Sequence, residues 1–161
     1  PVSYTPESSP NFEFYTGGIN WKGRLEVYEK HKNFKHVAEF SLNPLLSASD
    51  LMVSDISSAA LEFIILDKPV VYIDCPDFFK TTLKVWKQDP NLIKNDIRYN
   101  AGRNVGEVID DISKIKETVF QQLEHPSLYS KKRQKVNKRL LYNIGMGSKI
   151  AANKIVELYH A

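Results

Sequence analysis

The chain has 161 residues, of which 42% are hydrophobic, 11% aromatic and 25% charged, and its formal net charge is +3. This length suits one domain with a packed core, and the composition excludes a disordered chain. The charge balance is too even to indicate nucleic-acid binding, and no apolar run reaches the roughly 20 residues that a membrane-spanning helix needs. We therefore expect a single folded domain over residues 1–161.

Two further features concern context. The first residue is Pro1 rather than Met, and no basic or apolar leader follows it, which suggests a piece of a larger protein. The lone cysteine, Cys75, cannot form an internal disulfide, as suits a reducing compartment such as the cytoplasm.

The N-terminal third predicts loop, helix and short elements. Residues 1–18 are rich in Pro, Ser, Thr and Gly, so we expect a loop with one or two short strands. Apolar residues recur at helical spacing between residues 21 and 31, with Asn20 as a candidate N-cap. A short strand is predicted at 34–40 and a short helix at 43–49.

Residues 50–74 predict a strand, a helix and a second strand. The segment 50–55 has the length and composition of a buried strand, and 57–67 has Ala and Leu early enough to begin a helix. Pro69 sets the start of the strand at 68–74. Two strands joined by about a dozen helical residues form a right-handed crossover, so the strands should be parallel neighbours in an α/β fold.

The C-terminal half predicts mainly helices. We expect a helix or loop at 76–86 and a short edge strand at 96–100. One long helix is predicted over 104–123, because its apolar residues fall on one helical stripe: Val105, Val108, Ile109, Ile112, Ile115, Val119 and Leu123. Two more helices are predicted at about 127–142 and 146–160.

A polar cluster lies where the first predicted strand leads into the helix, and it comprises Ser54, Asp55, Ser57 and Ser58. Ligands of open parallel sheets bind outside the carboxyl ends of the strands, and a helix start presents N–H groups to a phosphate. The same residue types are also what helix capping requires. Glu62 lies one turn after Ser58 on the same face, where it could accept from a ribose hydroxyl or simply face solvent.

Two more segments carry candidate residues. Asp74 and Asp77 follow the second strand and could bind a donor hydroxyl or an acceptor, or cap the next segment. Residues 131–139 hold six basic side chains and no acidic one: Lys131, Lys132, Arg133, Lys135, Lys138 and Arg139. Such a run is ordinarily a solvated helix face, but it could also meet anionic lipid, a phosphate polymer or an acceptor.

No pattern identifies a catalytic residue, a metal site or a cofactor. The sequence has no zinc-ligand spacing, no Gly-x-Ser-x-Gly, no Walker sequence and no Gly-x-Gly-x-x-Gly after a strand. We interpret Cys75 as buried and inert. His31 and His36 fall at a predicted helix end and in a predicted strand, His125 falls at a predicted helix junction, and His160 is terminal.

Residues 45–79, "LLSASDLMVSDISSAALEFIILDKPVVYIDCPDFF", resemble the CDP-glycerol glycerophosphotransferases of teichoic-acid synthesis. The family pattern is an apolar strand, Asp-Tyr-Ser-Ser, an acidic residue four positions on, and a strand start with Lys-Pro. Residues 99–112 and 145–158 are more weakly similar to later parts of the family. By position, Asp55, Ser57 and Ser58 are similar to family residues around the donor phosphates, and Glu62 stands where the family has Asp.

This chain departs from the family pattern in two places. Ile56 replaces the Tyr of the motif. The family has a His-Pro pair upstream of the motif, with the His taken as catalytic, whereas the His-Pro here is His125-Pro126, far downstream.

The resemblance implies a Rossmann-like parallel sheet, as in the C-terminal, donor-binding half of a GT-B glycosyltransferase. It implies a donor-binding domain of a transferase that moves glycerol phosphate from CDP-glycerol to a lipid-linked or glycan acceptor. A missing N-terminal domain would supply the catalytic base, so the isolated domain should be inactive. The expected location is cytoplasmic, with contact to the inner membrane face.

Two alternatives stay open. The first keeps the fold but makes the donor a UDP-sugar, for glycosyl transfer or epimerisation. The second is a non-catalytic interaction module that presents residues 131–139 to a membrane or partner.

Overall fold

The computed structural model describes residues 13, 17–37, 41–77, 89 and 102–160, and it divides the chain into two compact units, 1–42 and 43–161. In the first unit, helix α2 (Trp21–Tyr28) is capped by Asn20, whose side-chain oxygen accepts from the Gly23 N–H at 2.9 Å. Both the helix and its cap were predicted. The strand predicted at 34–40 is absent from 34–37, and 38–40 lie outside the described residues.

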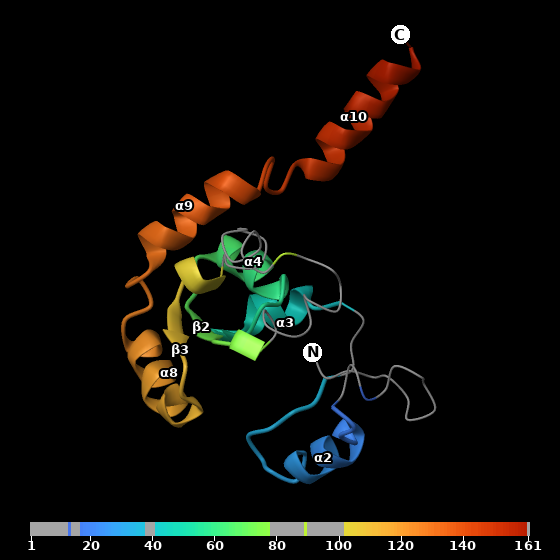
Figure 1. The fold of residues 1–161 in the computed structure, drawn as a ribbon. Helices are drawn as coiled ribbons and strands as arrows, with labels where there is room; N and C mark the ends of the chain where they lie inside the picture. Colours follow the sequence, from blue (N-terminus) through green and yellow to red (C-terminus); the bar gives the residue numbers. More distant parts are fainter. Residues whose placement is uncertain (1–12, 14–16, 38–40, 78–88, 90–101, 161) are drawn as a thin grey trace. The chain divides into compact units, whose positions relative to one another are not determined.

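The second unit is built on a parallel sheet (Figure 1). Its described elements begin with α3 (Asn43–Ala48), β1 (Met52–Ser54), α4 (Ala59–Phe63), the 3-10 helix η1 (Ile64–Leu66) and β2 (Val70–Ile73). They continue with η3 (Gly102–Asn104), β3 (Glu107–Ile109), η4 (Ile112–Lys114), α8 (Ile115–Glu124), α9 (Ser130–Leu140) and α10 (Gly147–Tyr159). β1 and β3 both pair with β2 in parallel, so the predicted α/β, Rossmann-like architecture is confirmed.

The Lys-Pro pair before β2 has two separate structural roles. Lys68 Nζ donates to the backbone carbonyls of Ser47 and Ser49, both at 2.7 Å, at the end of α3, where a cation is favoured. The carbonyl of Pro69 accepts from the Met52 N–H at 3.0 Å and so begins the β1–β2 pairing. The pair therefore fixes both the register of the sheet and the end of α3.

The long helix predicted over 104–123 is wrong in its first half, which forms β3 and η4 instead. Gly106 approaches β2 so closely that a Cβ there would lie 1.7 Å from the Val70 carbonyl oxygen. Asp111 then begins a new turn, because its carboxylate accepts from the Ser113 N–H at 2.9 Å. Pairing with β2 therefore overrides an apolar spacing that suits a helix.

β1 is less buried than predicted, since Val53 is 42% exposed and β1 is an edge strand of the described sheet. The segments expected at 76–86 and 96–100 fall largely or wholly outside the described residues. The helices predicted at about 127–142 and 146–160 are confirmed as α9 and α10.

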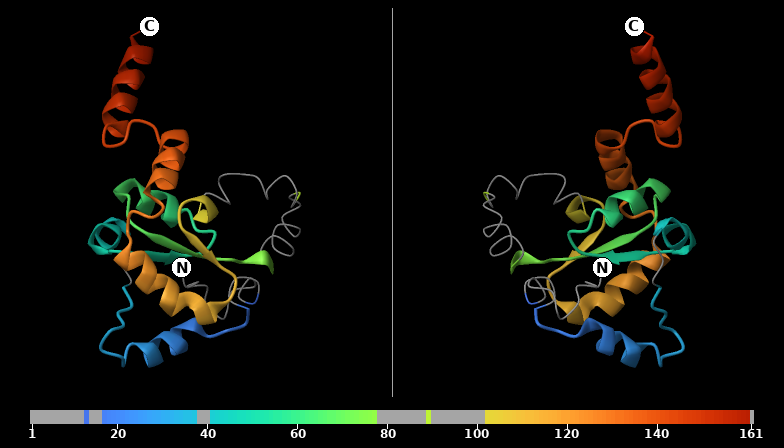
Figure 2. Two further views of the ribbon diagram at one scale, coloured as in Figure 1. Left: turned by 90° about the vertical axis from the view of Figure 1, so that its left-hand side faces the viewer. Right: turned by 90° about the vertical axis from the view of Figure 1, so that its right-hand side faces the viewer.

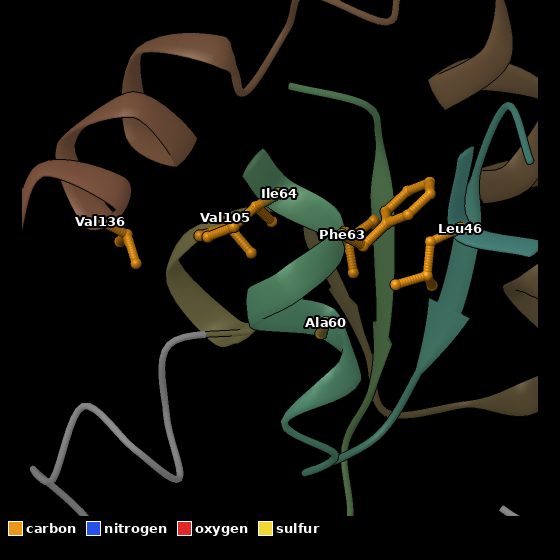
Figure 3. Packing of buried hydrophobic residues seen from close by; sticks show 7 residues of the cluster. Leu46, Ala60, Phe63, Ile64, Val105 and Val136 are labelled. Atoms are coloured by element: carbon orange, nitrogen blue, oxygen red, sulfur yellow. The ribbon is translucent and has the colours of Figure 1, made fainter. Parts of the chain in front are cut away.

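Helices cover both faces of the sheet (Figure 2). α4 and α9 lie on one side and α8 on the other. The main cluster of buried side chains lies on the α4 side (Figure 3) and comprises Leu46, Ala60, Phe63, Ile64, Val70, Val105 and Val136. Because its members come from different elements, the cluster joins α3, α4, β2 and α9. Burial of each large side chain in it contributes about 1.5–3 kcal/mol to the free energy of folding.

A polar network fastens α9 to the end of η1. Asp67 ends η1 with a positive φ of 53°, and its carboxylate accepts from Arg133 Nε at 2.8 Å and from Ser130 Oγ at 2.6 Å. Arg133 also donates to the carbonyls of Asp67 at 2.9 Å and Pro126 at 2.7 Å. Asn137 adds a bond to the Ile64 carbonyl at 2.8 Å.

Arg133 is fully buried, at 0% exposure, so its assignment to an exposed basic patch is wrong. A buried guanidinium needs a counter-charge and hydrogen-bond acceptors. Asp67 provides the charge, and its carboxylate and the two carbonyls accept from Nε and Nη2, while Nη1 has no acceptor among the described residues. The other five basic side chains of the run are exposed: Lys131, Lys132, Lys135, Lys138 and Arg139.

The Asp67 network makes stability depend on pH. Burial raises the pKa of Asp67, but hydrogen bonds from Ser130, Arg133 and Gln134, with the charge of Arg133, outweigh it and hold the pKa below the ordinary value of an aspartate. A carboxylate whose pKa is lower in the folded than in the unfolded protein contributes stability at pH values above its unfolded-state pKa. This contribution to the free energy of unfolding is lost as the pH falls through the folded-state pKa. The side chain is 38% exposed, so solvent screening weakens the effect.

We therefore expect the free energy of unfolding, measured with urea between pH 7 and pH 3, to fall less steeply in Asp67→Asn than in the wild type. Asn tolerates the positive φ at this position and cannot titrate. Asp50→Asn, at an exposed carboxylate, should keep the wild-type slope. Equal slopes in all three proteins would refute the role of Asp67.

Candidate functional site

The candidate site lies at the carboxyl edge of the sheet, where β1 ends at Ser54 and β2 ends at Ile73. Ser54 pairs in register with Tyr72, and Asp55 and Asp74 follow the two strands. Because the strands are parallel, these residues meet at one edge. Met52 and Val70 pack on the α4 side, and side chains two apart share a face, so Ser54 and Tyr72 also lie on that side.

The turn from β1 into α4 is built by its own side chains. Asp55 accepts from the Ser57 N–H at 3.1 Å, and Ser57 Oγ accepts from the Ala59 N–H at 3.2 Å. Ser58 is exposed and makes no side-chain cap bond, and Glu62 is exposed one turn later. α4 has only 5 residues, so its dipole is weaker than that of a long helix. Capping accounts for Asp55 and Ser57, whereas Ser58 and Glu62 stand at the surface beside them.

Asp74 forms an ion pair with Arg103, a residue that no sequence pattern indicated. Arg103 Nη2 donates to the Asp74 carboxylate, and the two side chains are 30% and 24% exposed. The guanidinium carbon lies 5.5 Å from the centroid of the Tyr72 ring, within the range of a cation–π contact. Arg103 belongs to η3, 29 residues beyond Asp74, so only the fold brings the pair together.

Tyr72 is the most deeply buried polar residue at this edge. Tyr72 is 1% exposed, and its hydroxyl makes no hydrogen bond of normal geometry among the residues that the structure describes. Burial raises the pKa of Tyr72 to about 12, with Asp55 and Cys75 acting in the same direction and Arg103 against it. The hydroxyl is therefore protonated at neutral pH and can donate a hydrogen bond, but it cannot serve as a base.

Cys75 is half-buried rather than buried, and burial raises the pKa of its thiol, helped by the carboxylates of Asp55 and Asp74. A thiol with a raised pKa is a poor nucleophile, as expected from the sequence. Asp77 is exposed, and the two phenylalanines after it lie outside the described residues.

The four histidines lie on elements other than those that form this edge. His31 and His36 belong to the first unit, where His36 Nδ1 lies 3.6 Å from Glu29. His125 and His160 end helices α8 and α10. Within the described ranges, no three His, Cys, Asp or Glu side chains form a group that could hold a metal.

A parallel sheet between helices, with hydroxyl, carboxylate and guanidinium groups at its carboxyl edge, defines a Rossmann-like α/β domain. The family model "CDP-Glycerol:Poly(glycerophosphate) glycerophosphotransferase" matches residues 20–157, most of the chain. The chain belongs to this family, and the resemblance found in its sequence is confirmed.

Curated relatives agree. The chain is 28% identical over 110 residues to the teichoic acid glycerol-phosphate primase of Bacillus subtilis, a match that covers 68% of this chain and 25% of the relative. It is 29% identical over 126 residues to that of Bacillus spizizenii, covering 74% and 31%. The teichoic acid ribitol-phosphate polymerase TarL of Staphylococcus aureus is 36% identical over 64 residues, covering 37% and 11%.

The chain thus spans between a quarter and a third of the length of the two primases. No solved structure matches it significantly.

Proposed function

We propose that this chain is the donor-binding part of a transferase that uses CDP-glycerol and delivers glycerol phosphate to a lipid-linked or glycan acceptor. The observation that carries the proposal is that Asp55, Ser57 and Asp74 meet at the carboxyl edge of a parallel sheet, in the segment that resembles the family motif. The names of the relatives, two glycerol-phosphate primases and a ribitol-phosphate polymerase, support an alditol phosphate as the transferred group.

In this proposal the residues at the carboxyl edge bind different parts of the donor. The hydroxyls of Ser54, Ser57 and Ser58 donate to the donor phosphates, while the carboxylates of Glu62 and Asp77 accept from ribose or glycerol hydroxyls. Phosphoryl transfer depends on positioning and on stabilising charge, which fixed hydrogen-bond donors supply. The base would come from outside the chain, in the N-terminal half of a GT-B enzyme, so the isolated chain should bind the donor without turnover.

Contact with a membrane surface is a second component of the proposal. α9 exposes five cations, and α10, which buries no residue, exposes apolar side chains that include Ile155, Leu158 and Tyr159. Cations beside exposed apolar groups suit an anionic lipid surface. Over the described part of the chain, no helix has the length and apolar character needed to cross a bilayer.

The test of donor binding is calorimetry of the double variant Asp55→Ala with Ser57→Ala. We expect its affinity for CDP-glycerol to fall at least about 10-fold, because each lost polar group orders the turn or contacts a phosphate. Lys131→Ala with Lys135→Ala, on exposed α9, should bind as the wild type does. Loss of binding in the lysine variant alone, together with steep salt dependence, would favour an interaction module instead.

A further inference from the structure

The Asp74–Arg103 pair raises the question of what this guanidinium recognises. Asp74 holds Arg103 from one side, and the face of the Tyr72 ring lies 5.5 Å from the guanidinium carbon. Both charged side chains keep roughly a quarter of their surface exposed, so the pair lies at the edge of the core and solvent can reach it. A guanidinium presents five N–H donors in one plane, so it can serve a carboxylate and a phosphate at once.

The hydroxyl of Tyr72 is the second observation. Buried polar groups in proteins are nearly always hydrogen-bonded, yet within the described part of the chain this hydroxyl makes no hydrogen bond of normal geometry, and the side chain that acts on it as a donor is Arg103 itself. It lies on the same side of the sheet as Ser54, its register partner, and close to Arg103. A ligand oxygen that reaches Arg103 along this face could therefore accept from Tyr72 as well.

Charge at the edge supports the same view. Asp55 and Asp74 place two carboxylates where an anionic donor would have to approach, and like charges repel. Arg103 is the cation whose charge acts on both Tyr72 and Cys75. A fixed cation beside the two carboxylates lowers the cost of binding an anion there.

We propose that Arg103, positioned by Asp74 across the ring of Tyr72, binds the phosphoryl oxygens of the donor. Arg103 then determines affinity for the phosphate-bearing part of the ligand, and Asp74 is a positioning residue that acts through Arg103. This inference rests on the proposed function, because the ligand is taken to be a nucleoside diphosphate derivative.

The main test compares CDP-glycerol with cytidine, which carries no phosphate. In Arg103→Gln we expect the affinity for CDP-glycerol to fall about 10- to 100-fold, the range for a charged hydrogen bond, and that for cytidine to stay unchanged. Unchanged cytidine binding also shows that the variant is folded. Arg103→Lys keeps the charge but loses the planar fork, so its loss should be intermediate. Arg139→Gln, the same change at an exposed site on α9, should bind both ligands as the wild type does.

The positioning role of Asp74 is tested by a double-mutant cycle. Asp74→Ala should weaken CDP-glycerol binding when it is introduced into the wild type. When it is introduced into the Arg103→Gln variant, it should weaken binding no further. Additive losses would mean that Asp74 acts independently of Arg103.

A measurement on the wild-type chain needs no folded variant. The side-chain ¹⁵N resonance of Arg103 should shift on titration with inorganic pyrophosphate and stay in place with cytidine. If CDP-glycerol and cytidine bind but Arg103→Gln loses no affinity, the inference is overturned while the proposed function stands. If neither CDP-glycerol nor cytidine binds the wild type, the proposed function fails. A shift of the Arg103 resonance with pyrophosphate alone would then mean that Arg103 binds phosphate but not this donor, which contradicts the inference.

Discussion

Gly106→Ala is expected to lower the free energy of unfolding by more than about 3 kcal/mol, the upper range for overpacking, or to prevent folding. The added Cβ would lie 1.7 Å from the carbonyl oxygen of Val70 and 2.7 Å from its carbonyl carbon. Val70 is fully buried in β2, which pairs with both other strands, so the backbone cannot move aside without disturbing the sheet. Urea unfolding followed by circular dichroism measures the effect.

Gly147→Ala is the matched control, because a Cβ at Gly147 meets nothing within 4 Å. Gly147 begins α10, and Ala is the better helix former by about 1 kcal/mol, so this variant should equal or exceed the wild type in stability. If the urea midpoint of Gly106→Ala equals that of the wild type, residue 106 does not lie as close to β2 as the structure places it.

Arg133→Ala is expected to lower the free energy of unfolding by about 2–3 kcal/mol. A fully buried pair that loses one partner costs about 3–5 kcal/mol, but the Asp67 side chain is 38% exposed and water can partly replace the lost bonds. The substitution also leaves the carbonyls of Asp67 and Pro126 without their donor and removes a side chain packed beneath α9. Urea unfolding at neutral pH is again the measurement.

Lys135→Ala, an exposed position on the same helix, should stay within about 0.5 kcal/mol of the wild type. Equal stability of the Arg133 and Lys135 variants would mean that the network does not fasten α9 to η1.

The strand–helix–strand unit at residues 50–74 could be predicted because its determinants are local. Pro69 immediately precedes β2, and Asp55 and Ser57 build the turn before a helix from their own side chains. β3 could not be predicted in this way. Val105 and Ile109 are four residues apart, and this spacing fits one face of a helix as well as it fits one face of a strand. The overlooked signal was Gly106, which weakens a helix and permits close backbone approach.

Residues whose roles depend on distant partners were the ones missed. Asp74 was selected from its place after a strand, but Arg103 and Tyr72 acquire their roles only when η3 packs beside β2. Arg133 was taken as one cation among six, because composition does not say which of them faces inward. A signal was present: Arg133 shares a helical face with Val136 and Leu140, which contact the core.

The most direct test of donor binding is an amide NMR titration with CDP-glycerol, CMP and UDP-N-acetylglucosamine at two salt concentrations. Saturable shifts at residues 54–62, 72–77 and Arg103, largest for the cytidine ligands and retained at high salt, are the predicted result. Shifts confined to 131–139 and abolished by salt, or none at the carboxyl edge of the sheet, would contradict it.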